Sequence, residues 1–215
     1  MELIKQETVI PKEIIETFES LEYEEDGFLK FHHLELNNDD LNYFFELHSG
    51  IQNQYELWKI SARNSRDWNI DSQFRYSYFN LYSEHCLLWR YNDLHIEVHT
   101  KRKSNDPNGL FRDLCSLHMN LDDGSLPVDS FINGNPITRC NSDFGVFAKG
   151  PKNLMTKYME LLNKYGRGAY LFGERDSLKW NGKNWIKEDG DYILMTIGEA
   201  YIIAKEFKFE KIKPV

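Results

Sequence analysis

Apolar and polar residues follow two different periods along this chain, and the first period is helical. Between Pro11 and Glu22, apolar residues recur at the three- and four-residue spacing that places them on one helix face. Proline suits the first turn of a helix, and the early Glu13 suits its positive end. The pattern predicts an amphipathic helix over Pro11–Glu22, with acidic residues on its outer face. Its apolar residues are Ile14, Ile15, Phe18 and Leu21.

The pattern then changes to the two-residue alternation of a strand. Asp26-Gly27 predicts a turn, and Phe28–Leu36 predicts the strand that follows it. Asn38-Asp39-Asp40 offers residues that commonly cap helices. We therefore expect a short helix from there through Phe44 and Phe45 to His48.

Aromatic residues dominate the next part of the chain. Residues 43–91 contain 13 of the 31 aromatic residues, and aromatic side chains favour half-buried strands. A tight hairpin at Tyr91-Asn92-Asp93 would join the last two strands of this region. The predicted strands are Tyr55–Ala62, Phe74–Tyr82, His85–Arg90 and Leu94–Thr100.

The second half mixes both periods. Helical spacing predicts helices at Leu110–Asn120 and Pro151–Tyr165, the second stopped by Gly166. The segment from Asp122 to Asp143 is long for a connection, so it is either functional or contains a short strand. A strand meander follows, with a hairpin turn at Trp180-Asn181-Gly182-Lys183 and a strand at Tyr192–Ile197. Tyr201–Phe209 fits a last strand and a helix equally well.

These elements predict an α+β fold in a single domain of 215 residues. We expect an aromatic-rich, mainly antiparallel sheet with three or four helices. Three regions make up this domain: an acidic helix and strand region at 1–48, the aromatic β-rich part at 49–103, and the remainder at 104–215.

Charge changes this picture, because it is unevenly distributed. Residues 1–48 hold 13 acidic and three basic residues, a net charge of −10, whereas the remaining 167 residues carry 23 basic and 21 acidic ones. A surface of this kind attracts a basic partner and repels nucleic acid and anionic membranes. We therefore expect no nucleic-acid partner and no membrane partner.

The acidic region predicts a protein-binding function. Carboxylates that surround aromatic side chains can steer a cationic protein and then bind it tightly. We expect an acidic module that neutralises a basic partner, as an immunity protein or an antitoxin covers the working surface of a toxin. The expected partner-binding residues are Glu24, Glu25, Asp26, Asp39, Asp40, Tyr43 and Glu46.

A metal-dependent enzyme is the first alternative. In a strand, His95, Glu97 and His99 would project from the same face, and two imidazoles with a carboxylate can bind a divalent metal. His85 would add a fourth ligand from a paired strand, and the 122–143 loop would act as a lid. The competing interpretation is the solvent-exposed face of an amphipathic strand.

Two further patterns carry chemistry. Cys115 and His118 lie three residues apart on a predicted helix, which is compatible with a thiol nucleophile and its base or with two buried core residues. A small-molecule sensor is the second functional alternative, with an aromatic pocket around Trp58, Trp68 and Trp89. We find no phosphate-binding loop, dinucleotide fingerprint or other cofactor motif, and we expect no cofactor.

A short stretch is similar to part of the ADP-ribosyltransferase motif. Gly166-Arg167-Gly168-Ala169-Tyr170 resembles the Gly-x-Gly-x-Tyr strand of that family, and Glu199 resembles its late glutamate. The His-Gly segment that the family uses upstream is missing here. We interpret Gly166-Arg167-Gly168 as a helix end that leads into a strand, and no family is identified.

Cysteine usage and the amino terminus bear on location. The three cysteines, Cys86, Cys115 and Cys140, cannot all pair, which is typical of free thiols in a reducing compartment. The amino terminus has no basic segment followed by an apolar one, so we expect no signal peptide. These observations predict a soluble, cytoplasmic protein.

Overall fold

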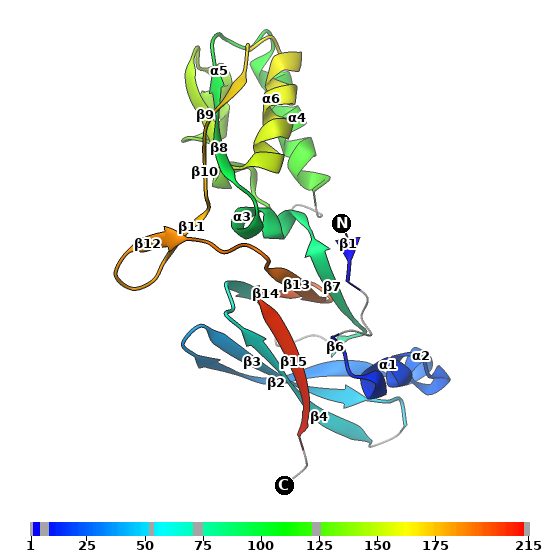
Figure 1. Ribbon diagram of the computed structural model, residues 1–215. Helices are drawn as coiled ribbons and strands as arrows, with labels where there is room; N and C mark the ends of the chain where they lie inside the picture. The colour runs from blue at the N-terminus through cyan, green and yellow to red at the C-terminus, as the bar shows by residue number, and fades with distance from the viewer. Residues whose placement is uncertain (1, 5–8, 52–53, 71–74, 122–125, 213–215) are drawn as a thin grey trace. The chain divides into compact units, whose positions relative to one another are not determined.

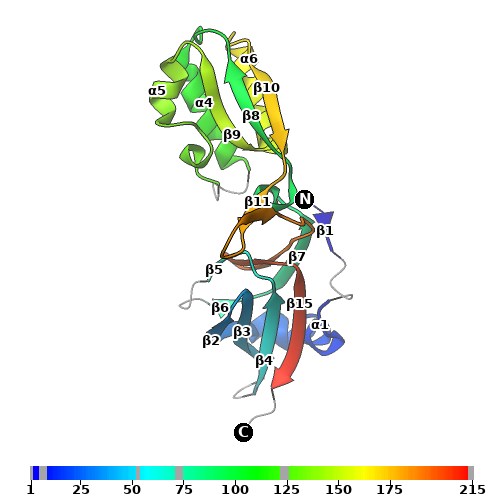
Figure 2. The same ribbon diagram turned by 60° about the vertical axis from the view of Figure 1, so that its left-hand side comes forward.

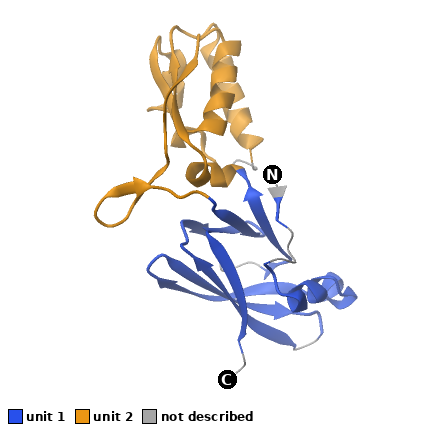
Figure 3. Cartoon of the chain, in the orientation of Figure 1, with its two compact units in different colours: residues 1–85, 191–215 blue, residues 86–190 orange. Residues whose placement is uncertain are grey.

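The computed structural model describes residues 2–4, 9–51, 54–70, 75–121 and 126–212. The fold is α+β, and all strand pairs among these residues are antiparallel, as predicted. The chain divides into two compact units (Figure 3). Unit 1 consists of Met1–His85 and Asp191–Val215, and unit 2 consists of Cys86–Gly190.

Unit 1 contains two five-stranded sheets and two short helices. One sheet has the strand order β1-β7-β13-β14-β5, and the other has the order β15-β4-β3-β2-β6. The elements are β1 (Glu2–Leu3), α1 (Lys12–Phe18), α2 (Leu21–Asp26), β2 (Phe28–Asn37), β3 (Asp40–His48), β4 (Tyr55–Arg63), β5 (Asp67–Asn69), β6 (Arg75–Tyr76), β7 (Phe79–Glu84), β13 (Ile193–Ile197), β14 (Ala200–Ala204) and β15 (Glu206–Ile212).

Strand β3 corrects the prediction of a helix before His48. Every second residue of β3 is apolar and fully buried, which is the pattern of a strand with one face on a core. Asn38 has a φ of 56°, so it forms the tight turn between β2 and β3 in place of a helix cap. The buried residues of β3 are Leu41, Tyr43, Phe45 and Leu47.

The predicted first helix is interrupted near its end. Helix α1 ends at Phe18, and Ser20 then begins α2, because its hydroxyl oxygen accepts a hydrogen bond from the Tyr23 backbone N–H at 3.3 Å. The Ser20 hydroxyl also donates to the Thr17 carbonyl oxygen at 2.7 Å. The acidic residues beyond Ser20 therefore lie on a second helix.

Unit 2 is built on a three-stranded sheet with the order β10-β8-β9, and α4 and α6 pack on one face of it (Figures 1 and 2). Ile96 and Val98 of β8 are buried on that face. The elements are η2 (Cys86–Leu88), α3 (Trp89–Asn92), β8 (His95–Thr100), α4 (Pro107–Met119), η3 (Val128–Ser130), α5 (Pro136–Asn141), β9 (Gly145–Pro151), α6 (Lys152–Lys164), β10 (Tyr170–Arg175), β11 (Leu178–Trp180) and β12 (Trp185–Lys187).

Helices α4 and α6 confirm the two predicted helices of the second half. The predicted strand at His85–Arg90 and its hairpin at Tyr91-Asn92-Asp93 are wrong. Leu88 and Tyr91 are both buried and lie three residues apart, a helical spacing, so η2 and α3 occupy this segment.

Three further segments of the prediction differ from or are decided by the structure. The described part of the 122–143 segment contains η3, the helix α5 and a single β-bridge between Ile132 and Ala148. The predicted strand from Phe74 to Tyr82 consists of β6 and β7, and Phe74 lies outside the described residues. Tyr201–Phe209 is strand throughout except for a break at Lys205, where β14 ends and β15 begins.

Unit 2 is inserted between two neighbouring strands of unit 1. Strands β7 and β13 pair with each other, with Phe79 opposite Ile197 and Tyr82 opposite Leu194. Each unit has its own cluster of buried apolar residues. The prediction that the whole chain forms a single domain stays a prediction. Among the described residues, no helix is both long and apolar enough to cross a membrane.

Candidate functional site

Seven exposed carboxylates lie on the two short helices of unit 1 and on the link between them. Each helix is held to the core by a buried residue, Ile14 in α1 and Tyr23 in α2, and the acidic residues at the other positions face solvent. The Tyr23 hydroxyl fixes α2 further, because it donates to the Ser77 carbonyl oxygen at 2.5 Å. We call the exposed carboxylates the acidic helix pair: Glu13, Glu16, Glu19, Glu22, Glu24, Glu25 and Asp26.

A groove runs between these helices and the start of β4. It consists of two adjoining hollows that share Thr17, Ser49 and Glu56, and the more open one has a volume of about 440 Å³. We call it the α1–β4 groove. Its lining residues are Glu13, Glu16, Thr17, Ser20, Glu22, Leu47, Ser49, Ile51, Gln54, Tyr55, Glu56 and Lys211.

Close packing of the β3–β4 loop positions one side of this groove. Gly50 has a φ of +90°, and a Cβ atom at this position would lie 1.9 Å from the carbonyl oxygen of Glu22. Only glycine allows the loop to approach α2 this closely. Neighbouring Ile51 and Tyr55 remain exposed, at 50% and 58% of their surface.

The groove is strongly acidic. The Lys211 ammonium group contacts a Glu56 carboxylate oxygen at 2.7 Å and a Glu13 carboxylate oxygen at 3.2 Å. The hydrogen bonds that Lys211 donates, foremost the one to Glu56 and then the one to Glu13, raise its pKa despite the opposing effect of burial. Lys12 pairs with Glu16 at 2.7 Å on the outer face of α1. Within the described part of the chain, no cation pairs with Glu22.

The structure separates the acidic residues that the sequence grouped together. Glu24, Glu25 and Asp26 lie directly before β2, whereas Asp39 and Asp40 follow it. The 10 residues of β2 span roughly 33 Å. The two acidic groups therefore lie at opposite ends of the β2–β3 hairpin (Figure 1) and do not form one surface.

Tyr43 and Glu46 also differ from the expectation. The Tyr43 side chain is fully buried in the core of unit 1, because it belongs to the inward-facing row of β3. Glu46 contacts His48 at 2.9 Å and Lys30 at 3.2 Å. Burial by itself would raise the pKa of Glu46, but the hydrogen bonds from His48 and Lys30 outweigh it and lower this pKa. Tyr43 is thus excluded as an exposed contact.

The predicted metal set lies on β8, with all three side chains on the face opposite α4 and α6. Glu97 contacts Lys149 at 2.7 Å and His99 at 3.0 Å. The hydrogen bond from Lys149 has the largest effect, and both bonds lower the pKa of Glu97. The Nε2 atom of His95 instead contacts the Arg90 carbonyl oxygen at 3.0 Å. Among the described residues, no three or more histidine, cysteine, aspartate or glutamate side chains converge as a metal site would require. His85 belongs to unit 1.

His118 has a structural role between two helices of unit 2. Its Nδ1 atom lies 2.5 Å from the Leu126 carbonyl oxygen, which can only accept a hydrogen bond, so Nδ1 carries the proton. Nε2 then accepts from the Tyr158 hydroxyl at 2.5 Å. With both nitrogens bonded in a buried position, His118 is not a free base for Cys115.

This geometry predicts a pH dependence of folding. Burial lowers the pKa of His118 from its usual value near 6.5, although the Leu126 bond opposes the shift. The unfolded chain therefore binds a proton before the folded one does, and stability falls as the pH drops below about 6.5. Urea unfolding of the wild type and of His118→Gln between about pH 5.5 and pH 7.5 measures this contribution. Parallel pH profiles for the two proteins would contradict it.

The three tryptophans of the sensor hypothesis lie in different environments. Trp58 is buried on β4, Trp68 on β5 is 39% exposed, and Trp89 begins α3 of unit 2. The indole N–H of Trp58 donates to the Glu56 carboxylate at 3.1 Å, so this residue helps to position a carboxylate that lines the α1–β4 groove. Trp58 and Trp68 belong to unit 1 and Trp89 belongs to unit 2, and the aromatic pocket stays a prediction.

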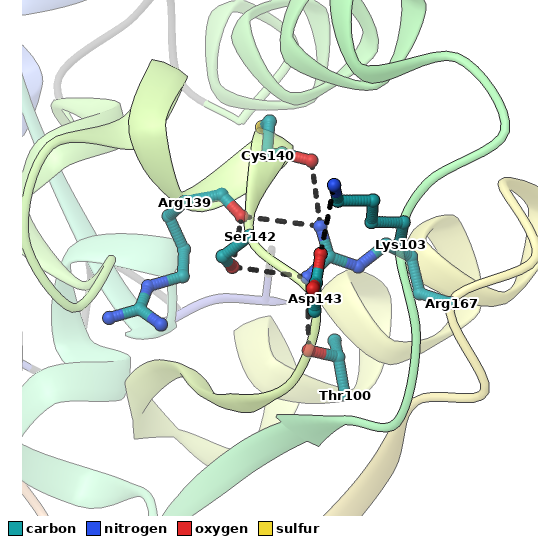
Figure 4. Close-up of polar contacts among 7 residues, drawn as sticks. All are labelled: Thr100, Lys103, Arg139, Cys140, Ser142, Asp143 and Arg167. Carbon is teal, nitrogen blue, oxygen red and sulfur yellow. Dashed lines mark hydrogen bonds and ion pairs between the residues drawn. The ribbon is translucent and has the colours of Figure 1, made fainter.

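The Gly166-Arg167-Gly168 segment is a helix end, as the sequence interpretation held. Gly166 has a φ of 73°, and the Arg167 N–H donates to the Leu162 carbonyl oxygen at 3.1 Å. Arg167 itself is fully buried, which the sequence did not indicate. Its guanidinium binds the carbonyl oxygens of Arg139 and Cys140 at the end of α5 (Figure 4).

Sequence reasoning found the acidic residues of α2 and missed the groove beside them. Ile51 comes from the β3–β4 connection, Tyr55 and Glu56 come from the start of β4, and no local motif marks them. Their role follows only from the packing of that connection against α1 and α2. No family model, no curated protein and no solved structure matches this chain, so the geometry of this site stands on its own.

Proposed function

We propose that this protein is an acidic binding module that neutralises a basic protein partner, in the manner of immunity proteins and antitoxins. The acidic helix pair and the α1–β4 groove form the contact surface in this proposal. The observation that carries it is a groove lined by four carboxylates and two exposed apolar side chains, Ile51 and Tyr55, next to the other exposed carboxylates of the acidic helix pair.

The charge of the two units supports the same surface. Unit 1 contains 11 basic and 21 acidic residues, a net charge of −10, and unit 2 contains 15 basic and 13 acidic residues, a net charge of +2. The acidity of the chain thus belongs to the unit that carries the groove. A field of this sign steers a cationic partner toward unit 1 and raises the association rate at low salt.

The groove supplies the short-range part of binding. Charged groups at an exposed rim mainly set the association rate, whereas buried aromatic and aliphatic contacts slow dissociation. Tyr55 stacks on His48, with 5.3 Å between ring centroids, so its ring is held in place before a partner arrives. A basic protein with an apolar side chain next to its cations fits this arrangement.

A pair of matched variants tests the proposal. Glu24→Gln/Glu25→Gln and Asp39→Asn/Asp40→Asn remove the same charge, but from opposite ends of the β2–β3 hairpin. We expect the first variant to lower the association rate with the partner by about 10-fold at low salt, within the range of electrostatic steering. The second should leave it nearly unchanged.

The partner is obtained by capture from a host lysate on the immobilised wild type at low salt, and surface plasmon resonance then gives the rates for each variant. The Asp39→Asn/Asp40→Asn variant is a conservative control. The Asp40 side chain accepts a hydrogen bond from the Asn64 N–H at 2.9 Å, and an asparagine side chain can still accept it. Equal rates for both variants, or a captured partner that is acidic, would refute the proposal.

A further inference from the structure

A hairpin in unit 2 exposes two tryptophans. Strands β11 and β12 form a two-stranded sheet of their own, with Trp180 directly opposite Trp185. Figures 1 and 2 show it apart from the three-stranded sheet of unit 2. Trp180 is 53% exposed and Trp185 is 66% exposed. We call residues 178–187 the Trp hairpin.

The apolar residues of this hairpin lack a core to cover them. Leu178 lies two residues before Trp180, so it shares the face of the tryptophans, and it is 48% exposed. The two indole rings contact each other, with 5.7 Å between ring centroids. An isolated two-stranded hairpin is only marginally stable in water, and exposed apolar patches mark interaction sites. The hairpin therefore has the properties of a docking element.

Charge restricts what can cover it. The segment from Arg175 to Lys187 carries four basic residues and one acidic residue, a net charge of +3. Asp176, the acidic one, pairs with Lys187 at 2.9 Å. A matching surface must be anionic and must offer apolar contacts to the tryptophans.

We propose that the Trp hairpin docks into the α1–β4 groove of a second copy of this chain. The groove has four carboxylates against one cation, Lys211, a net charge of −3 that matches the hairpin. Ile51 and Tyr55 provide its exposed apolar surface. The inference rests on the groove of the proposed function, and it identifies a cationic aromatic hairpin as the chemistry that the groove binds.

This contact is heterologous, because one copy contributes the hairpin and the other contributes the groove. Each copy keeps one unused surface of the opposite kind, so association continues into a ring or an open chain. Opposite charges hold the contact together, so it weakens as salt screens them.

Light scattering coupled to gel filtration tests the association. The mass of a single chain is 25.6 kDa. At low ionic strength, we expect the average mass to rise above this value as the protein concentration increases. In about 1 M salt, where the Debye length is about 3 Å, the mass should return to that of one chain. A single-chain mass at every concentration and salt would overturn the proposal.

Two complementary variants sharpen the test. Trp180→Ala/Trp185→Ala removes the hairpin contact, and Glu22→Gln/Glu56→Gln removes charge from the groove. Each variant alone should be a single chain, whereas an equimolar mixture should form complexes of two chains, one providing the groove and the other the hairpin. Trp68→Ala, at a partly exposed tryptophan outside both surfaces, should associate like the wild type. A mixture that stays monomeric would overturn the proposal.

Binding of the Trp hairpin to an anionic lipid surface or to a nucleic acid, in place of a second copy, would give different results. If vesicles of phosphatidylserine and phosphatidylcholine, or a single-stranded oligonucleotide, shift the tryptophan emission of a protein that stays monomeric, the second-copy proposal is wrong. The hairpin variant retains the groove, so it should still capture the basic partner. A wild-type protein that stays a single chain at every concentration but captures the basic partner refutes only this inference, and a wild-type protein that does neither refutes the proposed function as well.

Discussion

Replacing Arg167 by alanine is expected to destabilise the protein by about 3–5 kcal/mol, because it removes charge-assisted hydrogen bonds to buried oxygens and leaves a cavity. Its guanidinium donates to the Cys140 carbonyl oxygen at 2.8 Å, to the Arg139 carbonyl oxygen at 3.2 Å and to the Thr100 hydroxyl at 3.0 Å. Both carbonyls lie in the last turn of α5, where the carbonyls of a helix lack intrahelical partners, and the Arg139 carbonyl also accepts from the Ser142 hydroxyl at 2.8 Å. Arg167 thus ties α5 to β8 and to the end of α6.

The size of the effect follows from the burial of this site. Burial lowers the pKa of Arg167, yet an arginine remains charged in a protein, so its charge must be satisfied by the surrounding oxygens. Alanine would remove the Arg167 donor from the Cys140 carbonyl and the Thr100 hydroxyl and would open a cavity beside Phe147. The positive charge at the carboxyl end of a helix would be lost as well.

Urea unfolding followed by tryptophan fluorescence measures this prediction. Arg167→Met keeps most of the volume but has no donor, so it should remain destabilised, whereas Arg167→Lys should lie between it and the wild type. Arg112→Ala is the matched control, because the Arg112 side chain is 76% exposed and should change stability by no more than about 0.5 kcal/mol. An Arg167→Ala protein as stable as the Arg112→Ala protein would contradict the role given to Arg167.

Gly50→Ala should destabilise unit 1 and distort the α1–β4 groove. A φ of +90° costs a residue with a Cβ atom about 1–3 kcal/mol. The added methyl group would also overlap the Glu22 carbonyl, 1.9 Å away, and overpacking of this kind costs a further ~1–3 kcal/mol. The loop and α2 must separate to relieve the overlap, which moves Ile51 away from the acidic side of the groove.

Gly134→Ala separates the cost of the positive φ from the cost of the steric overlap. Gly134 has the same φ of +90°, but no atom lies within 4 Å of the position that its Cβ would take. The difference in unfolding free energy between the two variants therefore measures the contact between the loop and α2. We also expect Gly50→Ala, but not Gly134→Ala, to weaken binding of the basic partner. Equal losses of stability would show that the close approach of Gly50 to Glu22 contributes nothing.

Several elements were predictable because their determinants are local. Helix α6 combines a proline at its start, an apolar stripe and a glycine past its end, and strand β2 begins directly after Gly27, which ends α2. The β11–β12 hairpin forms around Asn181-Gly182, where the Asn181 side chain accepts from the Asn184 N–H at 2.8 Å. In each case, residues close in the sequence carry the information.

The errors arose where a local signal competed with burial. Asn38-Asp39-Asp40 can cap a helix or turn a hairpin, and only the burial of alternate residues from Leu41 to Leu47 decides for the hairpin. The same burial removes Tyr43 from the surface. His85–Arg90 looked like a strand from its apolar residues, but Leu88 and Tyr91 pack at helical spacing.

The sequence by itself determined the α+β class and the acidity of the first 48 residues, because composition and short-range periodicity express both. Only the tertiary structure decided where those acidic residues lie relative to one another and to the groove. It places Glu24 and Asp39 at opposite ends of one strand, and it brings Glu56 and Lys211 beside α1 from distant parts of the chain. The separation of two residues along the sequence does not predict such contacts, because they result from strand pairing and from the burial of apolar faces against one another.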